Sequence, residues 1–424
     1  MLAQTSQPIL NIAETAMIGR LGATELAARA IGAALIGSIY WVFAFLTFGT
    51  TTLIGHHFGA RDRQACGQTY LHALFVALLG GITVAGTGIT FAEPLYRLLG
   101  AEAAVVERGA NYFRVYSAGA PLTLMVYSSV GFFRGIQDTR TPLVIAFIIT
   151  LLQLSLDYAL IYGNFGLPAL GLIGAAVAAF IAQLGGATIY LALFLISRQT
   201  ADYRAAVGRR ITIAGLKPLF RIGQDLAIRT GALRLSLVFA TSTAARMGAA
   251  TLAAYEIVFQ LFMLCSDVID GLAIAGQALV AKHLGSHDQQ RAYRMGMTLT
   301  LTGCLAGLGF ALGFAVAWSE IVSFFTSSTE VSKLLTSGVM LLVSGLQPFN
   351  GMVFVLDGLL IGARDTRYLM WAMLAGAAIL VAVAWSSLQL SWGLPGILSA
   401  ISALMLWRSA TNLGRFLQQK WPVP

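Results

Sequence analysis

Acidic side chains interrupt several long apolar runs of this sequence. They lie at six positions, Glu14, Asp157, Glu256, Asp267, Asp270 and Asp357. A carboxylate in hydrocarbon is costly, so an acid kept there is expected to face a cavity or a partner. A buried carboxyl can exchange protons when water or a cation reaches it. The pattern therefore predicts sites for ion coupling inside a membrane protein.

Glu14 and Asp157 are the first candidate pair. If the helices that carry them touch, the two carboxyls would titrate jointly, with one of them protonated near neutral pH. Two inert alternatives stay open. Glu14 could be a helix-end residue that reaches the membrane interface, and Asp157 could be hydrogen-bonded to Tyr158 or Gln153.

The second half of the chain carries the other acids. Asp267 and Asp270 are three residues apart, so on a helix they share a face, and at least one should line a cavity. Arg234, which we expect deep in its helix, is their obvious partner, and an internal salt bridge is the alternative to a functional role. Glu256 lies near the start of its run, so an interfacial position is its alternative.

Composition places these acids in a membrane. Hydrophobic residues make up 57% of the 424, charged residues 11%, and the mean hydropathy is +0.77. A soluble domain carries about 25% charged residues, which excludes that class. The basic residues that give the net charge of +9 lie in loops between apolar runs. This distribution is typical of charges that set membrane topology and not of a nucleic-acid-binding face. The three cysteines, far apart, indicate neither a disulfide framework nor a metal site.

Apolar runs predict an all-α membrane protein with twelve transmembrane helices. The first run is short, and an upstream start would lengthen it. Lys and Arg gather on one side, which predicts that both termini are cytoplasmic in the inner membrane. The expected spans are 2–19, 33–58, 70–95, 111–134, 141–163, 169–196, 225–246, 251–281, 295–318, 334–362, 368–389 and 394–415.

The chain contains an internal repeat. Residues 20–64 align without a gap to 246–290, and GIQDTR at 135–140 matches GARDTR at 362–367 at nearly the same spacing. Six helices per repeat keep both halves in one orientation, so we expect parallel repeats around a central cavity and alternating access. The predicted lobes are 1–196 and 223–424, joined by a basic cytoplasmic linker at 197–222.

The acids do not follow the repeat. Glu14 and Asp157 align with alanines in the second half, and Asp270 and Asp357 align with Ala44 and Val130. Each half is therefore expected to own a different acidic site.

The two DTR motifs are expected to act as gates or hinges. Asp138 with Arg140, and Asp365 with Arg367, are placed to cap the helices that follow them. The sequence lacks a Walker motif, HExxH, GxSxG and Gly-rich dinucleotide motifs. We therefore expect neither ATP hydrolysis, nor a cofactor, nor an enzyme.

Several motifs together resemble the MATE multidrug-efflux family, in particular its DinF-like branch. They are AETAMIGRLGATELAA at 13–28, GFFRGIQDTRTP at 131–142, IDGLAIAGQALV at 269–280 and LDGLLIGARDTR at 356–367. The resemblance covers nearly the whole chain. It implies a two-lobed antiporter that exports organic cations in exchange for protons or sodium.

The resemblance also implies roles for single residues. Glu14 stands where the family has a coupling Asp, Asp157 matches a second family Asp, and Gln153 replaces an Asn. A threonine that helps to hold sodium falls on Ala179. Longer side chains and a missing hydroxyl should loosen a sodium cage, so we expect proton coupling, with sodium at Glu14 and Asp157 as the alternative. The family also carries an acid at a position that falls near Leu233, which is apolar here. Asp357 resembles a different acid of the family and is kept as a secondary candidate.

Two other functions remain open. A flippase for lipid-linked precursors should line its cavity with arginines, and here we expect only Arg234 deep, with Arg229 shallower. A membrane scaffold would not need Glu14 and Asp157. For the exporter, aromatic residues at 40–45 would suit amphipathic cations through cation–π contacts, with plain packing as the alternative. Beyond substrate and lipid we expect no partner and a monomer.

Overall fold

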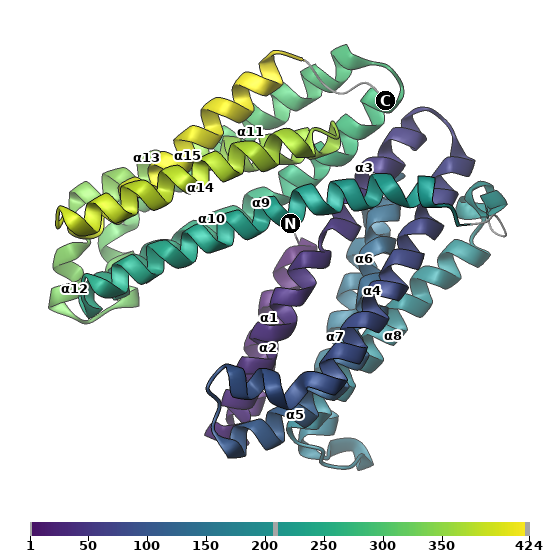
Figure 1. Cartoon of the computed structure of the whole chain (residues 1–424), viewed down its shortest axis with the longest axis horizontal. Coiled ribbons are helices and arrows are strands. Elements are labelled where there is room, and N and C mark those ends of the chain that lie inside the picture. The colour runs from purple at the N-terminus through teal and green to yellow at the C-terminus, as the bar shows by residue number, and fades with distance from the viewer. Residues whose placement is uncertain (1, 207–210, 420–424) are drawn as a thin grey trace. The chain divides into compact units, whose positions relative to one another are not determined.

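The computed structural model describes residues 2–206 and 211–419, and every regular element in these ranges is helical (Figure 1). The chain forms two compact units, one covering Leu2–Gly223 and one beginning at Gln224. The boundary between them falls inside helix α9 (Ile213–Arg246). We call them the N-terminal unit and the C-terminal unit.

The N-terminal unit holds eight α-helices and two short 3-10 helices before α9 begins. These are α1 (Leu2–Gly19), α2 (Ala23–Phe43), α3 (Phe45–Gly59), α4 (Arg63–Leu98), α5 (Ala103–Ala118), α6 (Ala120–Gly135), α7 (Arg140–Tyr162), η1 (Asn164–Gly166), α8 (Leu172–Ile196) and η2 (Arg198–Ala206). Helix α1 packs against α7, and α2 packs against α5.

The C-terminal unit takes up the rest of α9 and six further helices. These are α10 (Ala249–Gly285), α11 (Gln289–Phe325), α12 (Thr329–Leu334), α13 (Ser337–Gly362), α14 (Thr366–Gln389) and α15 (Gly393–Leu417). Helix α13 contacts α10, α11 and α15, so it is the central helix of this unit.

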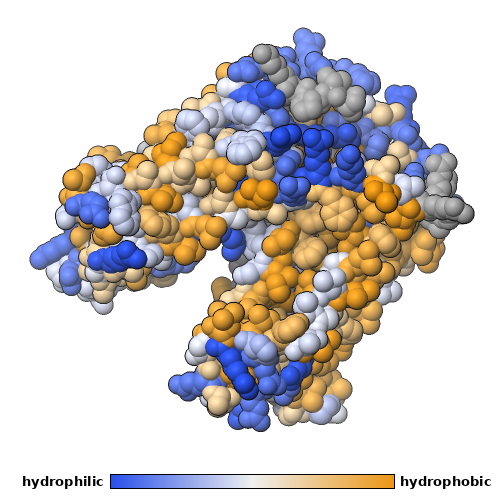
Figure 2. All heavy atoms as spheres, in the orientation of Figure 1, coloured by the Kyte–Doolittle hydropathy of each residue, from blue (hydrophilic) through white to orange (hydrophobic). Residues whose placement is uncertain are grey.

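The twelve-helix membrane fold predicted from the sequence is confirmed. Two of the expected spans are each divided into two helices, at Ala44 between α2 and α3 and at Gly119 between α5 and α6. Among the described residues, eight helices are long and apolar enough to cross a membrane by length and composition. Figure 2 shows hydrophobic residues along the flanks of the helices and hydrophilic residues at their ends.

The segment expected as a linker, 197–222, contains helical structure. It holds η2 and the first part of α9, and His72 of α4 contacts it by accepting a hydrogen bond from the backbone N–H of Thr212 (3.2 Å). Arg63 and Asp202 form an ion pair between α4 and η2. These contacts fasten the segment to the N-terminal unit.

The repeat is visible in the backbone conformation. Arg61 and His287, at matched positions, both adopt a positive φ, near 60°. The aspartates that follow them cap the next helices: Asp62 accepts the backbone N–H of Ala65 (2.8 Å), and Asp288 accepts that of Arg291 (2.9 Å). Because capping of this kind fixes where a helix begins, the two units start α4 and α11 in the same way.

Matched glycines allow helices to approach closely in both units. A Cβ added at Gly81 of α4 would lie 2.2 Å from the Cα of Pro121, and one at Gly307 of α11 would lie 2.2 Å from the backbone oxygen of Gln347. Small residues at helix interfaces permit such backbone contacts in membrane proteins. The repeat therefore preserves interhelical packing as well as sequence motifs.

Gly81→Ala should lower the free energy of unfolding by about 2 kcal/mol, because backbone atoms of α6 must move to accept the methyl group. Gly86→Ala in the same helix is the matched control. An added Cβ there meets open space, so it should be neutral or stabilising by up to about 1 kcal/mol. Thermal denaturation of the purified variants measures both, and equal melting temperatures would contradict the close approach.

Candidate ion-coupling sites

Two acids of the N-terminal unit lie in helices that pack against each other. Glu14 is in α1 and is 4% exposed, and Asp157 is in α7 and is fully buried. The hydroxyl of Tyr162 donates to the backbone oxygen of Met17 (2.9 Å), which fastens α7 to α1 one turn from these acids. Burial of Glu14 argues against its placement at the membrane interface.

Neither carboxylate oxygen of Asp157 has a hydrogen-bond partner among the described residues. Gln153 is also buried and lies one turn earlier, whereas Tyr158 is 49% exposed. The hydrogen bond from Tyr158 or Gln153 to Asp157, on which the inert interpretation depended, is not formed among the described residues. A buried polar group without a partner is costly and calls for an explanation.

Arg29 of α2 pairs with Glu14. Its Nε donates to Oε1 of Glu14 (3.1 Å), and its Nη1 donates to Oγ1 of Thr15 (2.8 Å). Asp157 lies within electrostatic range of both Glu14 and Arg29. The structure thus brings together two carboxyls and one guanidinium from α1, α2 and α7.

Arg29 was not among the site residues expected from the sequence. Its position inside the apolar run of α2 was the available indication. Helix α2 is held in place by Tyr96 of α4, whose hydroxyl donates to the backbone oxygen of Ala28 (2.8 Å). Gly32 makes room for this contact, since a Cβ there would lie 2.6 Å from the hydroxyl oxygen of Tyr96.

The aromatic run at residues 40–45 does not form one surface. Tyr40 meets Tyr127 of α6 edge to face, with centroids 6.2 Å apart, while Phe43 stacks on Phe45 (6.2 Å) and fills the space at Gly80. Trp41 is 51% exposed. Tyr40 therefore contacts an aromatic ring of another apolar span, whereas Phe43 and Phe45 contact each other.

Asp357 of α13 lies at the centre of a buried network in the C-terminal unit. Its Oδ2 accepts from Nη2 of Arg229 and from Nη2 of Arg408, and its Oδ1 accepts from Nδ2 of Asn412 (2.8 Å). Arg408 of α15 is 1% exposed and lies over the ring of Phe354, 5.6 Å from its centroid.

This network corrects two expectations about basic residues. Arg408, which was not expected to be deep, is fully buried, whereas Arg234, which was, is exposed. Asp270 lies within electrostatic range of Asp357, Arg229 and Arg408. A charged residue in a helix can face the interior or the surface, and its position along the sequence does not tell which.

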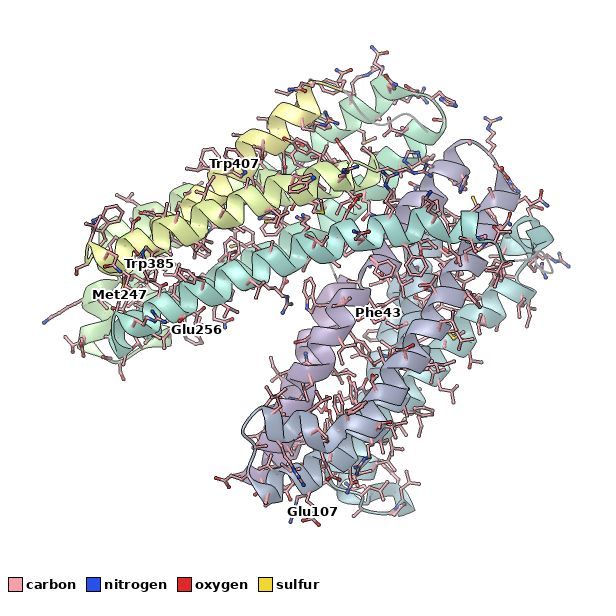
Figure 3. All side chains as sticks on the ribbon, in the orientation of Figure 1. Phe43, Glu107, Met247, Glu256, Trp385 and Trp407 are labelled. Atoms are coloured by element: carbon pink, nitrogen blue, oxygen red, sulfur yellow. The ribbon has the colours of Figure 1, made fainter. Side chains whose placement is uncertain are left out.

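The other two candidate acids of the C-terminal unit, Asp267 and Glu256, lie at its surface. Asp267 is exposed. Glu256 is exposed and accepts a hydrogen bond from Gln260 (2.7 Å). Figure 3 shows Glu256 close to the turn between α9 and α10, where Met247 is labelled.

The two DTR motifs form different contacts. Asp138 accepts the backbone N–H groups of Arg140 and Thr141 (both 3.0 Å) and caps α7. Asp365 instead accepts from Nε of Arg415 (2.6 Å) in α15.

The arginines of the two motifs, Arg140 at the start of α7 and Arg367 at the start of α14, are exposed. The loop before α14 is also tied to α9, where Oδ2 of Asp225 accepts from the hydroxyl of Thr366 (2.6 Å). Within residues 2–206 and 211–419, no cluster of three or more His, Cys, Asp or Glu side chains could hold a metal ion.

Comparisons with known proteins agree with this architecture. The MatE family model matches residues 1–159 and 232–386. The chain is 27% identical to Protein DETOXIFICATION 44 of Arabidopsis thaliana, in an alignment that covers 100% of the chain and 82% of that protein. It is 25% identical to DNA damage-inducible protein F of Escherichia coli over 95% of the chain and 90% of that protein.

A probable multidrug resistance protein NorM of Aromatoleum aromaticum is 28% identical over 86% of the chain and 79% of that protein. Among solved structures, an outward-facing multidrug resistance MATE transporter superposes with a TM-score of 0.86 at 20% identity, covering 99% of the chain and 92% of its own. A MOP superfamily transporter from Pyrococcus furiosus has a TM-score of 0.83 at 19% identity, with the same coverage. These likenesses and the family model place the chain in the MATE family of multidrug and toxic compound efflux transporters, as a multi-pass membrane protein that moves small molecules and is not an enzyme.

Proposed function

We propose that the protein is a proton-coupled antiporter that exports amphipathic organic cations. The observation that carries the proposal is the pair of buried acids, Glu14 and Asp157, on the packed helices α1 and α7. Asp157 has no hydrogen-bond partner among the described residues, so its carboxyl is free to take up and release a proton. Acids inside a membrane mark proton and ion pathways.

The chemistry of the N-terminal unit favours protons over sodium. A hard cation needs several oxygen ligands at short distances. Ala179 of α8 supplies no side-chain oxygen at the position where related transporters carry a threonine, and Oε1 of Glu14 already accepts a hydrogen bond from Arg29. A proton needs only one carboxylate oxygen.

Charge favours cationic substrates. Within the N-terminal site, two carboxyls face one guanidinium, so the ionised site carries a net negative charge. Tyr40 and Tyr127 add aromatic faces that suit organic cations. The NorM relative is named for multidrug resistance, in agreement with a broad substrate range.

The flippase alternative finds less support. A phosphate group needs unpaired cations, but Arg29 is bound to Glu14, and Arg229 and Arg408 are bound to Asp357.

We further propose that two lobes, 1–196 and 223–424, are joined by the linker 197–222, and that the protein is a monomer in the inner membrane. The distribution of loop charges supports cytoplasmic positions for both termini.

Efflux of a cationic dye from loaded proteoliposomes should follow a pH gradient, acid outside, with no sodium present. Each inward proton replaces the cation that leaves, so the gradient supplies the driving force. Dye fluorescence measures the rate, and liposomes without protein are the control. Efflux that needs an imposed sodium gradient would contradict proton coupling.

A further inference from the structure

Arg29 places its positive charge next to the carboxylate of Glu14, where a mobile cation would otherwise bind. Its guanidinium contacts Glu14 through Nε (3.1 Å), and its side chain is 11% exposed. A cation inside a membrane helix is costly, so its retention next to two carboxyls calls for a reason.

Arg29 is fixed rather than freely mobile. The Tyr96 hydroxyl holds the backbone oxygen of Ala28, the residue before it, and Nη1 of Arg29 donates to Thr15 (2.8 Å). Both anchors lie within the N-terminal unit: α1 holds the guanidinium, and α4 holds the backbone next to Arg29.

We propose that Arg29 is a tethered counter-ion that excludes sodium from the Glu14–Asp157 site and so determines which ion couples to transport. This inference rests on the proposed proton-coupled function and adds a residue that selects the ion. Sodium would have to enter beside a fixed positive charge, and like charges at contact distance repel strongly inside a protein. A proton binds Asp157 as a neutral O–H group and meets no such repulsion.

Two further helices present titratable groups to the pair. Helix α7 contributes Asp157, and α5 contributes Tyr112 and Tyr116, which lie within electrostatic range of both Glu14 and Arg29. Tyrosine hydroxyls are neutral at physiological pH. The charge of the site is therefore set by Glu14, Asp157 and Arg29, and removal of Arg29 leaves two carboxyls that can attract sodium.

The test compares Arg29→Gln with the wild type in the full-length protein. Melting temperatures are measured in sodium chloride and in potassium chloride at equal ionic strength. The wild type should show no difference, whereas Arg29→Gln should melt on the order of 2 °C higher in sodium, because a ligand that binds only the folded state stabilises it. In proteoliposomes, a sodium gradient should drive dye efflux by Arg29→Gln about tenfold faster than by the wild type.

Two further variants guard against a simple loss of folding. Arg29→Met removes the charge but keeps an apolar stem, and it should gain the same sodium response. Arg29→Lys keeps the charge and should remain insensitive to sodium. Arg108→Gln is the matched control, because Arg108 of α5 also pairs with an acid of α2, Glu25, but is 58% exposed.

The outcomes separate this inference from the proposed function. If the wild type follows a pH gradient and neither uncharged variant gains a sodium response, the role of Arg29 is overturned and proton coupling stands. If the wild type itself melts higher in sodium and follows a sodium gradient, both are overturned. A sodium response of Arg108→Gln equal to that of Arg29→Gln would also overturn the role of Arg29.

Discussion

Asp157→Asn is expected to reduce pH-gradient-driven efflux to the level of liposomes without protein. The amide has nearly the shape of the acid but cannot take up a proton at neutral pH, so the exchange step is lost. Because neither oxygen of Asp157 accepts a hydrogen bond from the described residues, no bond is lost on substitution. The free energy of unfolding should change by less than about 1 kcal/mol.

Glu256→Gln is the matched control for this experiment. Glu256 is a carboxyl of a membrane helix as well, but it is exposed and accepts a hydrogen bond from Gln260 one turn away. It should transport like the wild type. Full efflux by Asp157→Asn would exclude Asp157 as the proton carrier. If cells that carry the double variant Glu14→Gln, Asp157→Asn keep the drug resistance of the wild type, the protein would be better described as a membrane scaffold than as a transporter.

Asp357→Ala is expected to lower the free energy of unfolding by about 3–5 kcal/mol, because it leaves Arg229 and Arg408 buried without their shared carboxylate. Arg408 is 1% exposed, so its guanidinium would remain buried without a counter-charge. Thermal denaturation in detergent measures the loss, with the yield of folded protein as a second measure.

A combined variant separates charge balance from a specific role for Asp357. Replacing Asp357, Arg229 and Arg408 together by Leu, Met and Met removes the whole ion network at similar volume and should recover most of the lost stability. If Asp357→Ala instead melts like the wild type and loses only efflux, Asp357 is a coupling residue and the structural role is wrong.

Much of the fold follows from local patterns in the sequence. Apolar runs of membrane-spanning length predicted twelve spans, because hydropathy and helix length are properties of contiguous residues. The family was inferred separately, from the resemblance of four motifs. The division of two spans at Ala44 and Gly119 was not predicted. Hydropathy does not register either break, although Pro121 in the first turn of α6 is a helix-start signal next to Gly119.

Helical periodicity was informative for positions on one helix. Gln153 and Asp157 are one turn apart and both buried, and Asp138 caps the helix that follows it. The same reasoning failed for Arg234, which is exposed. Which face of a helix is buried depends on its neighbours, and in a membrane the face toward lipid is as apolar as the core.

The sequence by itself determined the membrane class, the repeat, the helices and the acids with unequal counterparts in the two halves. Only the tertiary structure decided which charges meet: Arg29 with Glu14, and Arg408 with Asp357. Each pair joins two helices. From the order of residues along the chain alone, neither arginine had been matched with its acid. Pairing across helices depends on how the helices pack in three dimensions, and no pattern of neighbouring residues encodes it.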